Sequence, residues 1–176
     1  MTPLDWTHLA TEIPSGGRQY TREATQAERA DVAAGLGILS CDRLTAVYTI
    51  RPLGKGHYKL EGPCSAQVTQ TCVASLAPVE SKLTLPLDIE FAPEAASFSD
   101  GEEVEVLDLP EVEAIENGCL RVGRVVFETL AAGLDPFPRA PDAAFSWNDR
   151  LATEEKPNPF AVLAKLKPRG PTGGGV

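Results

Sequence analysis

The sequence has only two histidines, His8 and His57, and neither has a second histidine, a cysteine or a carboxylate at a spacing typical of metal ligands. It contains no GxSxG nucleophile elbow, no phosphate-binding P-loop and no GxGxxG fingerprint. Cys72 would need a base and an orienting group to act as a nucleophile, and the sequence offers no candidate for either. We therefore expect a protein that is not an enzyme and that has no cofactor and no metal site.

Long apolar runs are also missing. No stretch approaches the roughly 18 apolar residues that a transmembrane helix needs. The first residues, MTPLDWTHLATEIP, carry two acids and no Lys or Arg, unlike the basic start of a signal peptide. The four cysteines, Cys41, Cys64, Cys72 and Cys119, form no CxxC pair. We predict a cytoplasmic protein with reduced, mostly buried thiols and no contact with a membrane.

The net charge of −9 is distributed unevenly along the chain. Residues 80–116 hold twelve acids against one base, Lys82, whereas the rest of the chain has 13 acids and 15 bases. The acidic segment favours a basic partner for the surface around Asp100–Glu116. Because most of the repulsion lies in one segment, RNA contact elsewhere stays open, and no DNA binding is expected.

A helix is predicted after Thr25, which can cap it together with Glu28 three residues later, and Gly35 or Gly37 would end it. A second helix is predicted over about Leu120–Ala132, where an apolar stripe recurs at spacings of four and Gly133 marks the end. That stripe consists of Val122, Val126 and Leu130, widened by Phe127 and Leu134.

Three stretches between these helices have the period of strands. The first begins near Cys41 and places Leu44, Ala46, Tyr48 and Ile50 on one face, and a turn is expected over 52–56. The second runs from His57 to Val73, with a break or bulge predicted at Gly62-Pro63. The third, Val79–Phe91, alternates most clearly, and Pro86 within it predicts an edge position or a bulge.

An acidic loop over 92–102 and a short strand over Glu103–Leu107 are expected to follow. The fold class is then α+β: an antiparallel sheet or small open barrel of four to six strands, with one helix before it and one after it. We expect a single domain over 1–150, a linker and short amphipathic motif over 151–167, and a disordered tail over 168–176.

The C-terminal stretch Asn158-Pro159-Phe160-Ala161-Val162-Leu163-Ala164-Lys165-Leu166-Lys167 resembles the ending of YceD-type large ribosomal RNA subunit accumulation proteins. Two further features match the family in order. Gly62, Cys72, Leu76 and Val79 are similar to its Gly…Cys…Leu-x-x-Val stretch, and Leu134–Arg139 is similar to its proline-bearing run after a helix. Some members carry a CxxC at the Cys72 position, but Ser75 stands at the partner position here, so no metal site is carried over.

The resemblance implies a non-enzymatic accessory role in the synthesis, processing or stability of large-subunit ribosomal RNA in bacteria. It implies a ribosome-assembly or RNA-processing protein as partner, or contact with ribosomal RNA itself. The C-terminal motif has an apolar face of Phe160, Leu163 and Leu166, which could dock on the protein's own core or bind a partner. We favour partner binding, with Asn158 and Pro159 starting the helical turn. The set of bases that could face RNA is Arg121, Arg124, Arg139, Lys165, Lys167 and Arg169.

Two alternatives remain open from the sequence. The acids Glu102, Glu103 and Glu105 could bind magnesium in a hydrolase or nuclease. A sheet of this kind could also be a small-molecule binding module. Magnesium that binds the native state would raise its thermal stability, so the absence of a shift at millimolar magnesium would rule out the first alternative.

Overall fold

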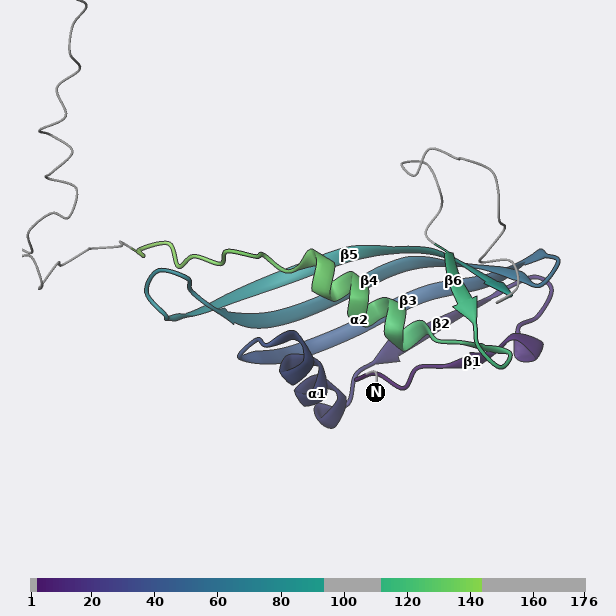
Figure 1. Ribbon diagram of the computed structural model, residues 1–176, viewed down its shortest axis with the longest axis horizontal. Coiled ribbons are helices and arrows are strands. Elements are labelled where there is room, and N and C mark those ends of the chain that lie inside the picture. Colours follow the sequence, from purple (N-terminus) through teal and green to yellow (C-terminus); the bar gives the residue numbers. More distant parts are fainter. Residues whose placement is uncertain (1–2, 94–111, 144–176) are drawn as a thin grey trace, which may run out of the picture. The chain divides into compact units, whose positions relative to one another are not determined.

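The computed structural model describes residues 3–93 and 112–143 (Figure 1). Their strands form a five-stranded sheet of order β2-β3-β4-β5-β6 and a two-stranded sheet of β1 and β7. The elements in chain order are β1 His8–Leu9, η1 Ala10–Glu12, β2 Arg18–Glu23, α1 Gln26–Leu36, β3 Ser40–Gly54, β4 His57–Thr71, β5 Pro78–Pro93, β6 Val112–Ile115, β7 Cys119–Leu120 and α2 Val122–Gly133. The α+β class is confirmed, and the main sheet is open and not a barrel.

Two details of the predicted topology are wrong. Strands β2 to β5 form an antiparallel meander, but β6 pairs with β5 in parallel, so the sheet is mixed. The first helix does not precede the sheet, because β2 comes before it and pairs with β3. Residues 92 and 93, expected to begin an acidic loop, belong to β5. The rest of that expected loop and the strand expected over Glu103–Leu107 lie outside the described residues.

The start and end of α1 follow from its sequence. The Thr25 side chain accepts a hydrogen bond from the Glu28 N–H at 3.2 Å, and the Glu28 carboxylate accepts one from the Thr25 N–H at 2.7 Å. This is the predicted capping box, which satisfies amide groups that the first helical turn leaves unpaired. Gly37 ends the helix in the left-handed conformation, at φ 66°, which a glycine adopts without steric cost.

The long strands β3 and β4 carry the core on alternate residues. The predicted face of Leu44, Ala46, Tyr48 and Ile50 is almost fully buried. The break or bulge expected at Gly62-Pro63 is wrong: β4 is continuous, and the β3–β4 register has the same offset at Ala46↔Cys64 as at Thr49↔Glu61. The register shifts lie instead between Cys41 and Arg43 and between Pro52 and Gly54.

Gly62 is required here by close packing. A Cβ atom at this position would lie 2.1 Å from the Val47 carbonyl oxygen of β3, and the backbone has a φ of 153°. Pro63 stands opposite Pro86 in the β4–β5 register. Since β6 pairs only with Glu90–Pro93, Pro86 lies in the part of β5 that has a single strand neighbour among the described residues, which agrees with the predicted edge position.

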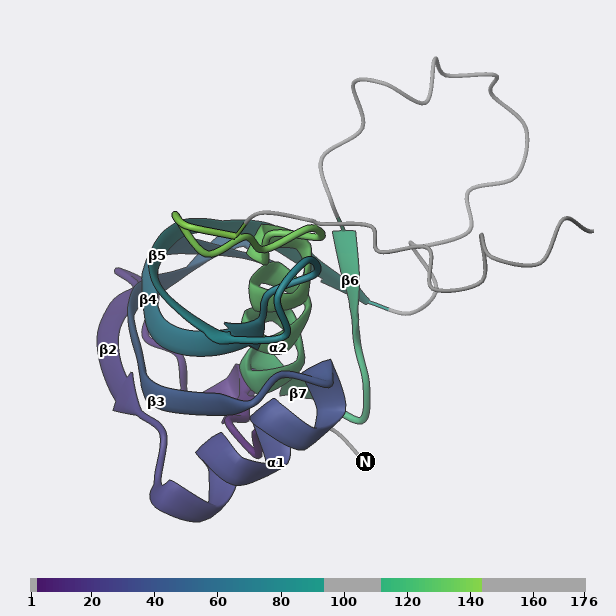
Figure 2. The ribbon, with the colours of Figure 1, turned by 90° about the vertical axis from the view of Figure 1, so that its left-hand side faces the viewer.

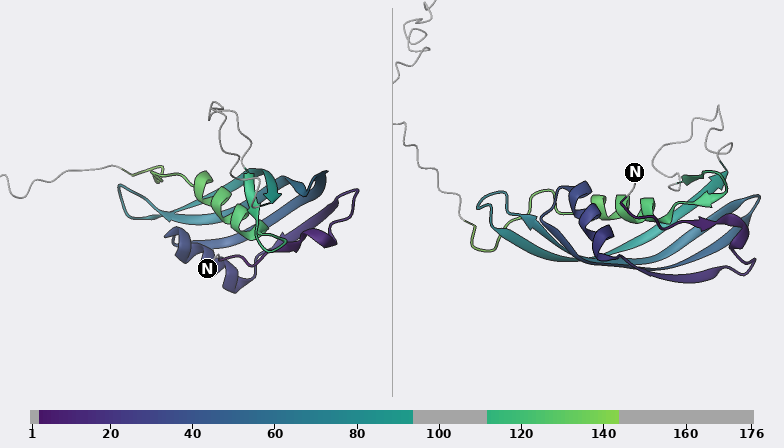
Figure 3. Two further views of the ribbon diagram at one scale, coloured as in Figure 1. Left: turned by 45° about the vertical axis from the view of Figure 1, so that its right-hand side comes forward. Right: turned by 90° about the horizontal axis from the view of Figure 1, so that it is seen from below.

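Both helices lie on the concave face of the sheet, which curves around α2 (Figures 2 and 3). The predicted stripe of α2 is confirmed, with Val122, Val126 and Leu130 fully buried. The helix begins two residues later than expected, because Leu120 belongs to β7, and its last helical residue is Gly133. α1 packs on β3 and α2 packs on β5. Among the described residues, no helix is long and apolar enough to cross a membrane.

Candidate interaction surfaces

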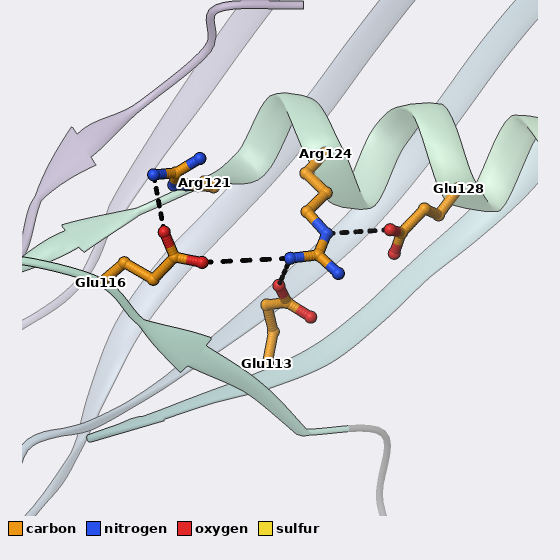
Figure 4. Close-up of polar contacts among 5 residues, drawn as sticks. All are labelled: Glu113, Glu116, Arg121, Arg124 and Glu128. Carbon is orange, nitrogen blue, oxygen red and sulfur yellow. Dashed lines mark hydrogen bonds and ion pairs between the residues drawn. The ribbon is translucent and has the colours of Figure 1, made fainter. Parts of the chain in front are cut away.

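Two of the bases predicted to face RNA, Arg121 and Arg124, lie in an ion-pair network at the start of α2 (Figure 4). Arg121 Nη2 is 2.6 Å from Glu116 Oε2, and Arg124 Nη1 is 3.1 Å from Glu113 Oε1. Arg124 Nε also donates a hydrogen bond to Glu128 Oε1 at 2.9 Å. Three carboxylates therefore surround two guanidinium groups.

This network is electrostatically satisfied without a ligand. The hydrogen bond to Glu128, together with the charges of Glu113 and Glu128, raises the pKa of Arg124. A phosphate approaching either arginine would have to displace a carboxylate and meet the remaining acids, which is unfavourable. The network joins β6, the turn after it and α2, so its geometry is that of a brace between these elements.

The third described base of the predicted set, Arg139, is exposed in the segment that follows α2. This segment runs against the turn between β4 and β5: the Val73 N–H donates to the Pro138 carbonyl at 2.9 Å, and the Ala140 N–H donates to Cys72 Sγ at 3.4 Å. The remaining predicted site residues lie outside the described residues. They are Asn158, Pro159, Phe160, Leu163, Leu166, Lys165, Lys167 and Arg169.

Three large apolar side chains are exposed where this segment meets the β4–β5 turn. We call Val73, Leu76 and Phe137 the tip patch; their exposed fractions are 48%, 76% and 70%. Val73 and Leu76 lie within the turn, and Phe137 precedes the residue whose carbonyl binds the Val73 amide. Exposed apolar side chains that gather in one place mark interaction sites more often than isolated ones do.

Leu76 is the most exposed of the three and has an unfavourable backbone. Its φ is 61°, in the left-handed region where a Cβ atom crowds the following carbonyl. Glycine or asparagine would fit this position with less strain, and either would be better suited to water. The Leu76 N–H donates to the Cys72 carbonyl at 3.0 Å, which holds the turn in this form. A strained, exposed leucine costs stability, which makes Leu76 a candidate for a role in binding.

Cys72 fixes the turn from inside. Its side chain is fully buried, and Sγ accepts hydrogen bonds from the backbone amides of Ser75 and Ala140, both at 3.4 Å. The Ser75 hydroxyl and these amides hold the pKa of the Cys72 thiol at about 6. The sulfur therefore links the β4–β5 turn, which carries Val73 and Leu76, to the segment after α2, which carries Phe137.

The charged residues near the tip patch are mostly acidic. Asp135 Oδ1 accepts a hydrogen bond from the Phe137 N–H at 2.9 Å, and Glu80 and Asp142 are exposed on the adjoining strand and segment. Arg139 is the base among them. An apolar patch with an acidic rim is complementary to an apolar surface that carries Lys or Arg.

The other groups singled out in the sequence take ordinary structural places. His57 Nδ1 lies 2.6 Å from Glu90 Oε1 across β4 and β5, where the two side chains form a cross-strand pair. No group of three His, Cys, Asp or Glu residues in the described part of the chain is arranged to hold a metal ion. The acids of the magnesium hypothesis, Glu102, Glu103 and Glu105, lie outside the described residues.

The tip patch was missed by sequence reasoning, although two of its members belong to motifs that were singled out. Leu76 is in the Gly…Cys…Leu-x-x-Val stretch, and Phe137 is in the proline-bearing run. What the sequence did not show is that a buried sulfur and a backbone hydrogen bond bring the two motifs together. No family model, curated protein or solved structure matches the chain.

Proposed function

We propose that the protein is a non-enzymatic accessory factor for the accumulation of large-subunit ribosomal RNA, and that it acts through a basic protein partner. The resemblance of residues 158–167 to YceD-type proteins supports the process. The observation that carries the mode of action is the tip patch, where a strained leucine is kept exposed at a cost to stability. A surface held in this way suits recognition of a partner better than it suits chemistry.

Charge supports the choice of a basic partner. The chain carries −9 overall, and residues 80–116 account for more than this excess. Asp135, whose carboxylate accepts the Phe137 N–H, places part of the negative charge beside the tip patch. A ribosomal protein or an RNA-processing enzyme with an apolar, basic surface would be attracted over a distance and then bury Leu76 and Phe137.

Leu76→Asn tests this mode of action, because stability and binding should change in opposite directions. Asparagine tolerates the left-handed backbone, so releasing the strain should stabilise the fold by about 1 kcal/mol and raise Tm. The loss of the apolar side chain should reduce co-sedimentation of the purified full-length chain with large-subunit precursor particles by about tenfold.

Leu53→Asn is the matched control, since Leu53 has an exposed fraction of 51% but lies at the opposite end of the sheet, near the β3–β4 turn. It should leave co-sedimentation unchanged. If Leu76→Asn raised Tm and co-sedimented as the wild type does, the tip patch would have no role in partner binding.

The C-terminal motif makes a separate prediction. Phe160→Asp should weaken partner capture and leave the Tm of the domain nearly unchanged, because we propose that this apolar face binds outward. Ala161→Asp, one residue away from the face, controls for the added charge. A large fall in Tm for Phe160→Asp alone would show that the segment is packed core.

A further inference from the structure

The edge strand β2 has an unusual surface for a strand that borders the core. Five of its six residues are exposed, and only Tyr20 is partly buried. Arg18, Tyr20 and Arg22 alternate along the strand and therefore share one face. This is the face of Tyr48 and Ile50 on β3, the concave side of the sheet. The two helices pack on β3 and β5, and β2 keeps its two arginines exposed on this side.

Tyr20 is held in place by a stack of rings. Its ring centroid lies 5.8 Å from that of the buried Tyr48, at an interplanar angle of 29°, and 4.1 Å from that of His8. His8 Nε2 is 2.8 Å from the Tyr48 hydroxyl, which fixes the imidazole as well. The aromatic group is therefore positioned before any ligand arrives, and this lowers the entropic cost of binding.

The two arginines beside this ring have no ion pair in the described part of the chain. Arg43, Arg51, Arg121 and Arg124 each face a carboxylate within 4.0 Å. Arg18 instead has its guanidinium 5.6 Å from the Tyr20 ring centroid, and Arg22 interacts with the Tyr48 hydroxyl. The nearby Glu28 uses its carboxylate oxygens to accept hydrogen bonds from Thr25 and Trp6.

His8 reports the local electrostatic environment. Burial, followed by the positive charges of Arg22 and Arg18, lowers its pKa to about 4. Arg18 and Arg22 thus bring two positive charges to this edge of a chain whose net charge is −9, and the Glu28 carboxylate interacts with Arg22 from the side of α1. The imidazole stays neutral near pH 7, so it can stack and hydrogen-bond without adding to the charge.

We infer that Arg18, Tyr20 and Arg22, backed by His8, form a binding site for single-stranded RNA. Phosphates would bind the two guanidinium groups, and an unpaired base would stack on the Tyr20 ring once the Arg18 guanidinium, which lies over that ring, turns to a phosphate. The arginines are four residues apart on one strand, or roughly 13 Å, so they flank the ring on both sides. A fully paired duplex has no free base to stack, which makes single-stranded RNA the better fit. The site is separate from the tip patch and goes beyond the proposed function.

Fluorescence anisotropy with a labelled single-stranded oligoribonucleotide and the full-length chain tests this site. Replacing both arginines, in the variant Arg18→Gln/Arg22→Gln, should weaken binding and reduce the slope of log affinity against log salt by about 1.4, the value for two phosphate contacts on a single strand. Tyr20→Leu should weaken binding by about tenfold, and Tyr20→Phe should leave it unchanged, since only the second keeps the ring.

The double variant Arg43→Gln/Arg51→Gln is the control, because it removes the same charge from two exposed, ion-paired positions. It should bind as the wild type does, and thermal unfolding of each variant checks that the fold is intact. An equal loss of affinity in the control would show that only net charge matters. Unchanged binding in folded Tyr20→Leu would overturn the stacking site, as would a duplex that binds as tightly as the single strand.

Discussion

At the residue scale, His8 shows how a surface histidine becomes insensitive to physiological pH. Its imidazole is partly buried against Tyr20 and Tyr48 and lies near the charges of Arg22 and Arg18. These surroundings disfavour the protonated form, so the pKa falls from 6.5 to about 4. This could not be predicted from the sequence, because the groups come from β1, β2 and β3 and meet only in the folded chain.

The pKa of His8 predicts a pH dependence of stability. Between pH 6.5 and about 4 the unfolded chain binds a proton at His8 that the folded chain does not, so the free energy of unfolding should fall as the pH falls through this range. His8→Gln removes this proton linkage, whereas the carboxylates affect the acid stability of the wild type and of the variant equally. Chemical denaturation at a series of pH values should therefore show a shallower acid slope for the variant. Equal slopes would contradict the proposed environment of His8.

At the element scale, the helices and strands that could be predicted are those with local signals in their own sequence, such as a cap or an apolar stripe. Helix α1 carries its capping box and its final glycine, and β3 and α2 each bury the stripe that their periodicity indicates. β2 could not be predicted, because its sequence RQYTRE has no apolar alternation and its pairing with β3 makes it a strand. β6 likewise depends on a parallel partner far away in sequence.

Gly62 and the arginines of the candidate sites also depend on contacts with residues that are distant in sequence. Gly62-Pro63 looked like a break because a proline cannot donate to a ladder, whereas the tertiary structure uses the glycine for close contact with β3. Arg121 and Arg124 were predicted to face RNA. The sequence did not show that the carboxylates of Glu116 and Glu113 would lie within ion-pair distance of them. For Arg18 and Arg22, the absence of an ion pair with any carboxylate of the described residues is visible only in three dimensions.

The packing of α2 on the N-terminal segment predicts a glycine requirement. A Cβ atom at Gly123 would lie 2.2 Å from the Leu4 carbonyl oxygen, while the Gly123 N–H donates to the Trp6 carbonyl at 2.8 Å and prevents the segment from moving away. Alanine normally favours a helix by about 1 kcal/mol over glycine, but here Gly123→Ala should destabilise the fold by about 1–3 kcal/mol. Gly16→Ala, with nothing within 4 Å, should be nearly neutral in the same denaturation experiment.

At the scale of the whole molecule, the described residues carry two surfaces of opposite character. The tip patch is apolar with an acidic rim, and the concave side of β2 is aromatic and basic. The first comes from the turn between β4 and β5 and the second from the edge strand β2, so each can be changed without touching the other. A factor that binds a basic protein through one surface and unpaired RNA through the other would bring the two together.

We propose that this protein supports the accumulation of large-subunit ribosomal RNA through the tip patch. The most direct measurement is the ratio of large-subunit to small-subunit ribosomal RNA in cells that lack the protein and are given back the wild-type chain, Leu76→Asn or Leu53→Asn at equal levels. The account predicts a low ratio that the wild type and Leu53→Asn restore and that Leu76→Asn does not. An unchanged ratio in cells without the protein would contradict the role itself, and full restoration by Leu76→Asn would contradict the tip patch as its means.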